Sequence, residues 1–354
     1  MLAMVKGMTM IASHQVRLEV PLTAELSDQL IQTWMALFRS PFEELRNVLN
    51  GTETSQNRDI FYLFWKAAEL AGTCHLTYPK ADPTLGGLGE VATVPAFRGR
   101  GIASELCRIA LQDFRQAGGE ALFLGTGNPA AARVYRRLGW QKLAGANVWA
   151  NILSGESPEA FLVNYFRESS PISVVPASPA HRIPMVPLIL APHDWQVLDA
   201  NAGLFSTRYV VQNSCMGLYP RYERLLQTGR GTWFGAHTMN GRLVGLATVC
   251  VDSSLCAQVD GFTHAKYPSA WDDLIQSAIR WAAANQARTC QAVVSREDEE
   301  KLWLFEGLGF RIIGSGDEFN LEGRPVRSVR VELTVEGPSD DSGTAGAKSA
   351  DPLP

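Results

Sequence analysis

Hydrophobic and polar positions along the chain follow two patterns, one typical of helices and one typical of strands. In residues 23–38 and 101–116, apolar side chains recur every three or four positions and so share one helix face. Thr23 is a suitable N-cap for the first helix, and Gly118-Gly119 ends the second. Shorter apolar runs predict strands at 17–20, 59–65, 71–77, 86–95, 121–124 and 148–152. Further helices are predicted from Pro41 to Asn50-Gly51, from Asn128 to Gly139, and at 158–166.

The second half of the chain repeats this order of elements, starting near Ile172. Asn240-Gly241 is a typical hairpin turn between two predicted strands. Gly307-Leu308-Gly309-Phe310 repeats the pattern of Arg137-Leu138-Gly139-Trp140. The other predicted elements are a helix at 219–226, strands at 232–237 and 243–250, a helix at 271–285, a strand at 290–294 and a helix at 298–306. Because 354 residues exceed one compact core, we predict two similar domains.

Composition narrows the class of protein and its partners. Hydrophobic residues make up 46% of the chain and charged residues 19%, as in a globular protein, and the net charge is −4. Such a weak acidic balance gives no reason to expect nucleic acid or a membrane as a partner. The apolar start lacks a convincing cleavage site, and there is no run of 18 apolar residues. We therefore expect a cytoplasmic protein.

The cysteines carry no metal-binding or disulfide pattern. They are scattered, and no two form a C-x-x-C pair. We therefore expect no metal site and free thiols in a reducing compartment. The six are Cys74, Cys107, Cys215, Cys250, Cys256 and Cys290.

The sequence Arg98-Gly99-Arg100-Gly101-Ile102-Ala103 joins a predicted strand to a predicted helix. The glycines have no side chain to keep a ligand away, and Ala103 is small. The first N–H groups of a helix point outward and favour an anion. The loop is therefore a candidate phosphate cradle; a short Gly-Arg stretch also fits a plain surface turn.

At these positions the sequence resembles the GNAT superfamily of N-acetyltransferases. The phosphate loop of that superfamily reads (Gln/Arg)-x-x-Gly-x-(Gly/Ala), and residues 98–103 match each fixed position. Its next motif has an Asn at a helix start, a Tyr within the helix and a Gly-aromatic pair after it, and Asn128, Tyr135 and Gly139-Trp140 match these. The resemblance covers about residues 15–152. It implies an α/β fold with a central mixed, twisted sheet (α+β) flanked by helices.

The resemblance also implies a site for acetyl-CoA as the acyl donor. The backbone of Ala92, Thr93 and Val94, at the end of the strand before the loop, would hold the pantetheine arm and the thioester oxygen. Asn128 would contact the arm, act as a plain N-cap, or do both. Tyr135 would be the general acid that protonates the leaving thiolate, unless it only packs within its helix. The pyrophosphate would bind at Arg98, Gly99, Arg100, Gly101, Ile102 and Ala103.

Transfer to an amine also needs a base. Strand alternation places Glu90 on one face with Leu88, Ala92 and Val94, and a Glu in that strand is a usual solution in the superfamily. A solvated residue at a strand end is the alternative for Glu90. His75, at the end of an earlier strand, is a second candidate base, with a structural role as its alternative.

The second half resembles a copy of the same fold that has lost its cofactor site. Alignment of Gly309 with Gly139 puts Phe305 in place of Tyr135, Asp298 in place of Asn128 and Trp271 in place of Gly101. Phe305 lacks a hydroxyl for acid catalysis. Trp271 would block a pyrophosphate, and the adjacent Asp272 and Asp273 would repel it.

These residues predict an acetyl-CoA-dependent N-acetyltransferase, an acyltransferase that acts on a primary amine of a small molecule by direct attack in a ternary complex. We expect the early helices and Gly125-Thr126-Gly127 to line the acceptor site, with the second half packed against the first. Two alternatives stay open: an acyl-CoA-binding regulatory or structural protein without turnover, and a protein or peptide N-acetyltransferase. The sequence indicates neither the amine, the acyl chain nor the oligomeric state. The predicted organisation is a ragged N-terminus (1–14), a catalytic domain (15–153), a connector (154–173), a degenerate domain (174–335) and a disordered tail (336–354).

Overall fold

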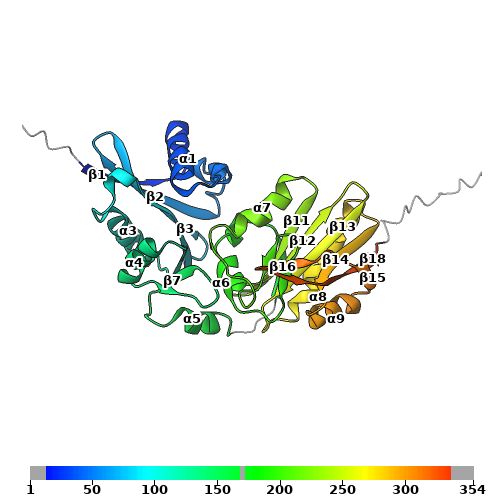
Figure 1. The fold of residues 1–354 in the computed structure, drawn as a ribbon. Helices are drawn as coiled ribbons and strands as arrows, with labels where there is room; N and C mark the ends of the chain where they lie inside the picture. Colours follow the sequence, from blue (N-terminus) through cyan, green and yellow to red (C-terminus); the bar gives the residue numbers. More distant parts are fainter. Residues whose placement is uncertain (1–12, 168–171, 336–354) are drawn as a thin grey trace, which may run out of the picture.

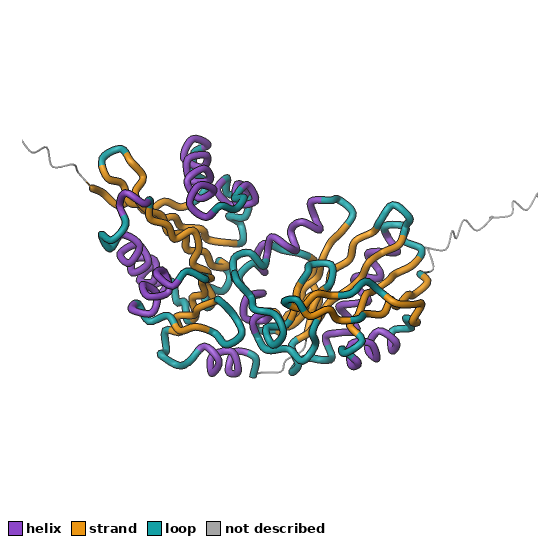
Figure 2. Tube along the Cα trace, viewed as in Figure 1, coloured by secondary structure: helices purple, strands orange, loops and turns teal. Residues whose placement is uncertain are grey.

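The computed structural model describes residues 13–167 and 172–335 (Figure 1). The predicted tail and residues 1–12 of the predicted ragged N-terminus lie outside the described residues. Ser13 and His14, predicted as part of that N-terminus, instead begin a strand and pair with Lys66 and Trp65. The described chain forms two seven-stranded mixed sheets flanked by helices, an α/β fold (Figures 1 and 2).

The first sheet has the strand order β1-β2-β3-β4-β5-β7-β6. Its strands are β1 (Ser13–Glu19), β2 (Asn57–Lys66), β3 (Glu69–Pro79), β4 (Leu85–Thr93), β5 (Ala121–Gly125), β6 (Gln141–Lys142) and β7 (Val148–Ile152). β4 and β5 run parallel and pair only over residues 85–87 and 121–123. Because β4 continues to Thr93 without β5, the two strands leave an opening between them.

Helices cover both faces of this sheet. α1 (Ala24–Phe38) packs on one face, where Trp34 stacks on Phe61 of β2. α3 (Ile102–Gln116) and α4 (Pro129–Arg137) pack on the other face. Thr23 caps α1 as predicted, because its hydroxyl accepts the N–H of Leu26.

Two short helices complete the first half. The segment after Pro41, predicted as one helix, is a 3-10 turn (Glu43–Leu45) followed by the single turn of α2 (Arg46–Leu49). α5 (Pro158–Tyr165) follows β7 and agrees with the predicted helix at 158–166.

The second sheet repeats the order of the first. Its order, β8-β11-β12-β13-β14-β18-β15, places equivalent strands in equivalent positions. The strands are β8 (Ile172–Pro176), β11 (Gly231–Thr238), β12 (Leu243–Val251), β13 (Cys256–Thr263), β14 (Thr289–Ser295), β15 (Arg311–Ser315) and β18 (Ser328–Thr334). The helices are α6 (Met185–Leu190), α7 (Tyr219–Gln227), α8 (Ala270–Ala284) and α9 (Glu299–Gly307). Two short pairs lie apart, β9 (Val197–Asp199) with β10 (Leu204–Phe205), and β16 (Phe319–Leu321) with β17 (Arg324–Val326).

Sequence reasoning missed β13. Gln258, Asp260 and Gly261 interrupt its apolar residues and hide the alternation. Asp260 is buried in the structure, and the Lys301 ammonium, 2.6 Å from its carboxylate, offsets the cost of burying this charge. A strand whose buried charge is neutralised by a distant helix has no local signature.

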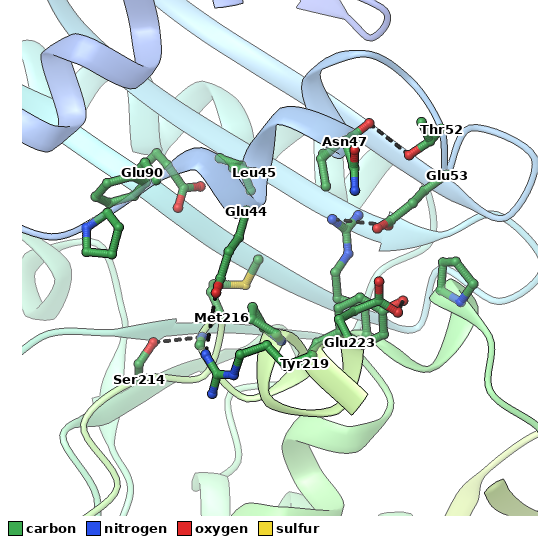
Figure 3. A pocket seen from close by; sticks show the side chains of 18 of the residues that line it. Glu44, Leu45, Asn47, Thr52, Glu53, Glu90, Ser214, Met216, Tyr219 and Glu223 are labelled. Carbon is green, nitrogen blue, oxygen red and sulfur yellow. Dashed lines mark hydrogen bonds and ion pairs between the residues drawn. The ribbon is translucent and has the colours of Figure 1, made fainter. Parts of the chain in front are cut away.

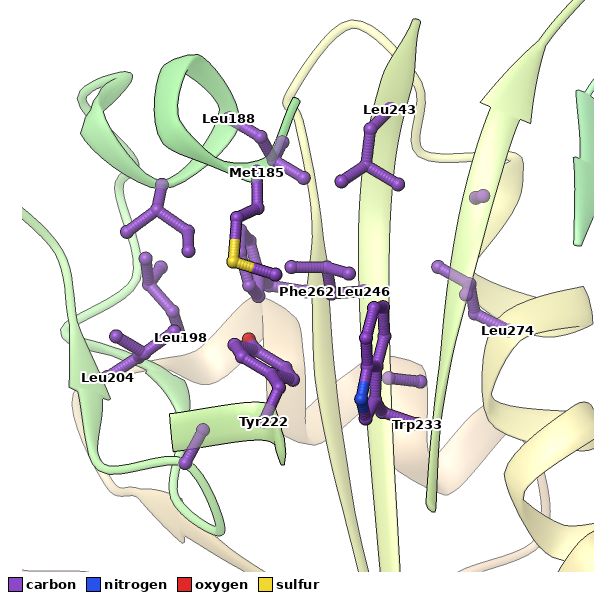
Figure 4. Close-up of a cluster of buried hydrophobic side chains, with 14 of the residues drawn as sticks. Met185, Leu188, Leu198, Leu204, Tyr222, Trp233, Leu243, Leu246, Phe262 and Leu274 are labelled. Carbon is purple, nitrogen blue, oxygen red and sulfur yellow. The ribbon is translucent and has the colours of Figure 1, made fainter. Parts of the chain in front are cut away.

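The core of the second half lies between its sheet and the segments that cover it. Tyr222 of α7 packs edge-on to Trp233 of β11, with ring centroids 5.4 Å apart. Met185 and Leu188 of α6 approach the same sheet, beside Phe262 (Figure 4). No helix in residues 13–167 and 172–335 is long and apolar enough to cross a membrane.

Side chains fill the region of the second half that corresponds to the loop 98–103. Trp271, at the first turn of α8, is 1% exposed and packs edge-on to both Trp195 and Phe305. The Lys301 side chain is equally buried and also donates to the carbonyls of Val197 and Leu198. These residues occupy the space next to the start of α8.

The two halves share one core and a close backbone contact. A single apolar cluster includes Phe123 and Val148 of the first sheet together with residues of α6, α7 and the second sheet. Segment 212–217 of the second half lies against β4 and β5, and the Asn147 N–H donates to the Gln212 carbonyl at 2.7 Å. A Cβ on Gly125 would lie 2.9 Å from Ser214 Cα, so this contact requires glycine.

We predict that Gly125→Ala weakens the contact between the halves. The new Cβ would meet Ser214 backbone, which cannot rotate away, so the free energy of unfolding should fall by about 1–3 kcal/mol. Thermal unfolding and hydrogen exchange of residues 212–217 would measure the effect. Gly127→Ala is the matched control, because its Cβ would meet no atom within 4 Å. Equal stability of the two variants would contradict a tight contact at Gly125.

Candidate active site

β4 carries a bulge at Glu90. His75 of β3 pairs with Gly89 and Thr73 pairs with Ala92, so β4 has one residue more than β3 between these pairs. Glu90 has a φ of +48°, which is uncommon for a residue with a side chain. Its carbonyl accepts the Thr73 hydroxyl at 2.6 Å, which holds the bulge in place.

The bulge reverses the alternation expected from the sequence. Leu88 packs in the cluster beneath α3, whereas Ala92 packs in the cluster beneath α1. Val94 lies beyond the strand, at the start of a 3-10 turn. The expectation that Leu88, Glu90, Ala92 and Val94 share one face is therefore wrong.

Glu90, His75 and Asp59 form a line of hydrogen bonds across three neighbouring strands. The Nδ1 of His75 lies 2.8 Å from Glu90 Oε2, and its Nε2 lies 2.8 Å from Asp59 Oδ1. The His75 side chain is fully buried. Burial opposes a charge on the ring, but the two carboxylates outweigh it and raise the pKa of His75. His75 can donate to both carboxylates at once only as an imidazolium.

The second half extends this line through Arg182, which lies between the 3-10 turn Pro179–His181 and α6. Its Nη2 lies 2.7 and 2.9 Å from the two Asp59 oxygens and 2.8 Å from the Thr77 hydroxyl, and its Nη1 lies 3.3 Å from Glu53. Burial alone would raise the pKa of Asp59, but Arg182 and then His75 outweigh it and lower the pKa to about 2. Burial raises the pKa of Glu53. We call the group Glu53, Asp59, His75, Glu90 and Arg182 the relay.

A cavity of about 550 Å³ opens beside Glu90, between the two halves; we call it the interdomain cavity (Figure 3). The first half contributes residues within 40–53 together with Glu90. The second half contributes Pro179, Arg182 and residues within 214–227, which include the first turns of α7. Four carboxylates and two guanidinium groups line the cavity: Glu44, Glu53, Glu90, Glu223, Arg182 and Arg224.

The loop 98–103 lies at the end of β4, before α3. Gly99 and Gly101 have φ angles of +75° and +79°, and a Cβ at either would meet no atom within 4 Å. Among the described residues, no backbone or side-chain group accepts the N–H groups of Ile102, Ala103 and Ser104. Open glycines before free N–H groups at the start of a 15-residue helix fit a phosphate group.

The arginines of the loop and the end of β4 complete this region. Arg98 Nε donates to the Thr93 carbonyl at 3.1 Å, and the Arg100 guanidinium lies 5.6 Å from the Phe97 ring. The Val94 N–H bonds the Ala71 carbonyl of β3. Because backbone N–H groups alternate along a strand, the Thr93 N–H points to the other side, into the opening between β4 and β5. Of the three strand-end residues, Thr93 is thus the one whose N–H faces this opening, and Ala92 is buried.

α4 holds the other two predicted residues. Asn128 Oδ1 accepts the N–H of Ala130 at 2.9 Å, so Asn128 is the N-cap of α4. Tyr135 is 5% exposed and its ring packs on Trp140. Burial raises the pKa of Tyr135 well above its ordinary value, and no described side chain or backbone group hydrogen-bonds its hydroxyl. The phenol therefore stays protonated.

Sequence analysis named Glu90 and His75 as candidate bases but missed Glu53, Asp59 and Arg182. Asp59 and His75 are polar residues within two apolar strands, and that shared anomaly was the available signal. No sequence signal pointed to Arg182, because it lies 123 residues from Asp59 in the chain. Gly125, expected to line the acceptor site, is instead covered by Ser214 and Cys215.

Residues 27–140 match the family model of the acetyltransferase (GNAT) family. No curated protein matches the chain.

Among solved structures, a GNAT-family acetyltransferase from Streptococcus pneumoniae is 16% identical, with 47% of this chain and 100% of that chain covered and a TM-score of 0.36. A phosphinothricin acetyltransferase from Sinorhizobium meliloti, in complex with AcCoA, is 15% identical (49% and 94% covered, TM-score 0.38). A spermidine/spermine N-acetyltransferase from Vibrio cholerae is 14% identical (46% and 93% covered, TM-score 0.37). Residues 27–140 thus form a domain of the acetyltransferase (GNAT) family, and the second half repeats the strand order of the first, as in a tandem arrangement.

Proposed function

We propose that the chain transfers an acetyl group from acetyl-CoA to a primary amine of a small molecule, by direct attack in a ternary complex. The position of Glu90 carries this proposal. Its carboxylate lies on the wall of the interdomain cavity, and its backbone forms the bulge of the strand that leads to the phosphate loop. A base placed there is next to both the acceptor and the donor.

Each residue has a role that its surroundings support. Bound acetyl-CoA supplies a thioester whose carbonyl carbon the amine attacks. The loop 98–103 and the first N–H groups of α3 bind the phosphates, and the Thr93 N–H faces the pantetheine arm. Glu90 accepts the proton that the amine loses. Tyr135, protonated because it is buried, gives its proton to the departing sulfur.

The charges of the interdomain cavity favour a cationic acceptor. Glu44 pairs with Arg224 at 3.4 Å and Glu53 with Arg182, which accounts for both guanidinium groups. Glu223 accepts the Tyr219 hydroxyl at 2.6 Å and forms no ion pair with a described residue. Its uncompensated negative charge favours an amine that carries a second positive group.

Thiol release from acetyl-CoA over a panel of amines tests the function. The panel contains monoamines, diamines, amino acids and a short peptide with a free N-terminus. We expect release with small amines and a lower KM for diamines than for amino acids, whose carboxylate would face the glutamates. Binding of acetyl-CoA without release from any amine would favour a regulatory protein, and release with the peptide alone would favour a peptide acetyltransferase.

We predict that Gly101→Trp abolishes acetyl-CoA binding. The substitution copies Trp271 of the second half and places an indole over the free N–H groups at the start of α3. Calorimetric titration with acetyl-CoA would measure the loss. Gly118→Trp is the matched control, because Gly118 has a φ of +88° with open space around it, beyond the other end of α3. Normal binding by Gly101→Trp would show that this loop is not the phosphate site.

We predict that Tyr135→Phe lowers kcat by about 10²-fold and leaves the Kd for acetyl-CoA nearly unchanged. The variant keeps the ring that packs on Trp140 and loses only the proton donor. Steady-state kinetics and calorimetry give the two values. Tyr78→Phe, in the same apolar cluster, controls for the loss of a buried hydroxyl. An unchanged kcat would remove Tyr135 from the mechanism.

A further inference from the structure

We propose that Arg182, supplied by the second half, is a positioning residue for the base of the first half: it holds Asp59 and, through Asp59, sets how tightly His75 and Glu90 hold their shared proton. This inference rests on the proposed function for its catalytic meaning. The geometry of the relay by itself supports the structural part of the inference: Arg182 of the second half controls the protonation of His75 in the first half.

Arg182 is built into the first half. Its side chain is 5% exposed, and its guanidinium contacts β2, β3 and the segment before β2 through Asp59, Thr77 and Glu53. The residues just before it are docked on the same segment. Asn57 Nδ2 donates to the Pro179 carbonyl at 2.8 Å, and the Ala180 N–H donates to Gln56 Oε1 at 3.0 Å.

The His75 ring passes the effect of Arg182 to Glu90. With Nε2–H donated to Asp59, the bond between Nδ1 and Glu90 holds one proton. That proton sits either on the ring, with Glu90 as a carboxylate, or on Glu90, with the ring neutral. The base is the pair without this proton: the amine nitrogen loses a proton, and the His75–Glu90 pair gains it. Whatever changes the charge beside His75 changes the proton affinity of the pair.

The charges around the pair fix the direction of the effect. Asp59 and Glu53 attract the proton, and Arg182 offsets them. Across the interdomain cavity Glu44 is offset by Arg224. The thiols of Cys74 and Cys215 interact electrostatically with Glu90, and burial raises the pKa of both, which keeps them neutral. Tyr219 and Glu223 of α7 complete the surroundings. Loss of Arg182 therefore leaves Asp59 and Glu53 uncompensated, and the pair holds its proton more tightly.

Two variants should shift the titration of His75 in opposite directions. Arg182→Met removes the cation, and we expect the midpoint to rise by roughly one pH unit; Asp59→Asn removes the anion, and we expect it to fall by a similar amount. Arg182→Lys keeps the charge, so its midpoint should differ from that of the wild type by less than half of that shift. The double variant, which lacks both charges, should return close to the wild type. A merely structural role would lower stability or rate in all variants without opposite shifts.

NMR of protein labelled at histidine 13Cε1 reports the midpoint directly, with His75→Gln to assign its signal among the six histidines. The acid limb of kcat/KM against pH should move with it. The proposal would be overturned if Arg182→Met and Asp59→Asn shifted the His75 midpoint in the same direction, or did not shift it. If Arg182→Met does not fold, a comparison of Asp59→Asn with Arg182→Lys still tests the proposal, because only Asp59→Asn should lower the midpoint of the His75 titration. The titration needs no turnover, so a chain inactive with every amine would refute the proposed function and leave this test intact.

Discussion

The buried ion pair between Arg182 and Asp59 is the interaction on which the arrangement of the molecule depends. Removing two charges from water is costly, and the cost is offset only when dense hydrogen bonding surrounds the pair. Here the Asp59 oxygens bond Arg182 and His75, and the guanidinium also reaches Thr77 and Glu53. These bonds require the two halves to meet in one geometry. The shape of the interdomain cavity and the state of His75 both follow from it.

The two halves share a fold, but the equivalent space is open in the first half and filled by side chains in the second. In the first half, β4 and β5 diverge beside open glycines and free N–H groups. In the second half, Trp271 fills the corresponding space at the start of α8, and Lys301 joins α9 to β13 and β9. A filled space stabilises a core, whereas an open one is available to a ligand. The second half has thus become a packing partner that also shapes the cavity.

Local pattern predicted much of the fold, because helix caps, turn glycines and apolar periodicity act over a few residues. Thr23, Asn128 and the loop 98–103 are examples. The bulge at Glu90 escaped prediction, since a register shift is fixed by the neighbouring strand and not by the strand itself. β13 escaped because Lys301, 41 positions after Asp260, makes its burial possible. The relay joins four segments far apart in the chain, so its members could be suspected one by one but not assembled.

α7 gives the interdomain cavity one of its walls, although it belongs to the half whose own ligand space is filled. In the function proposed above, the donor-binding residues lie in the first half, while Tyr219 and Glu223 line the interdomain cavity from the second. Under that proposal the first half alone would bind the donor, whereas both halves would bind the acceptor. Substitutions in α7 would then alter which amine is accepted and leave the donor site unchanged.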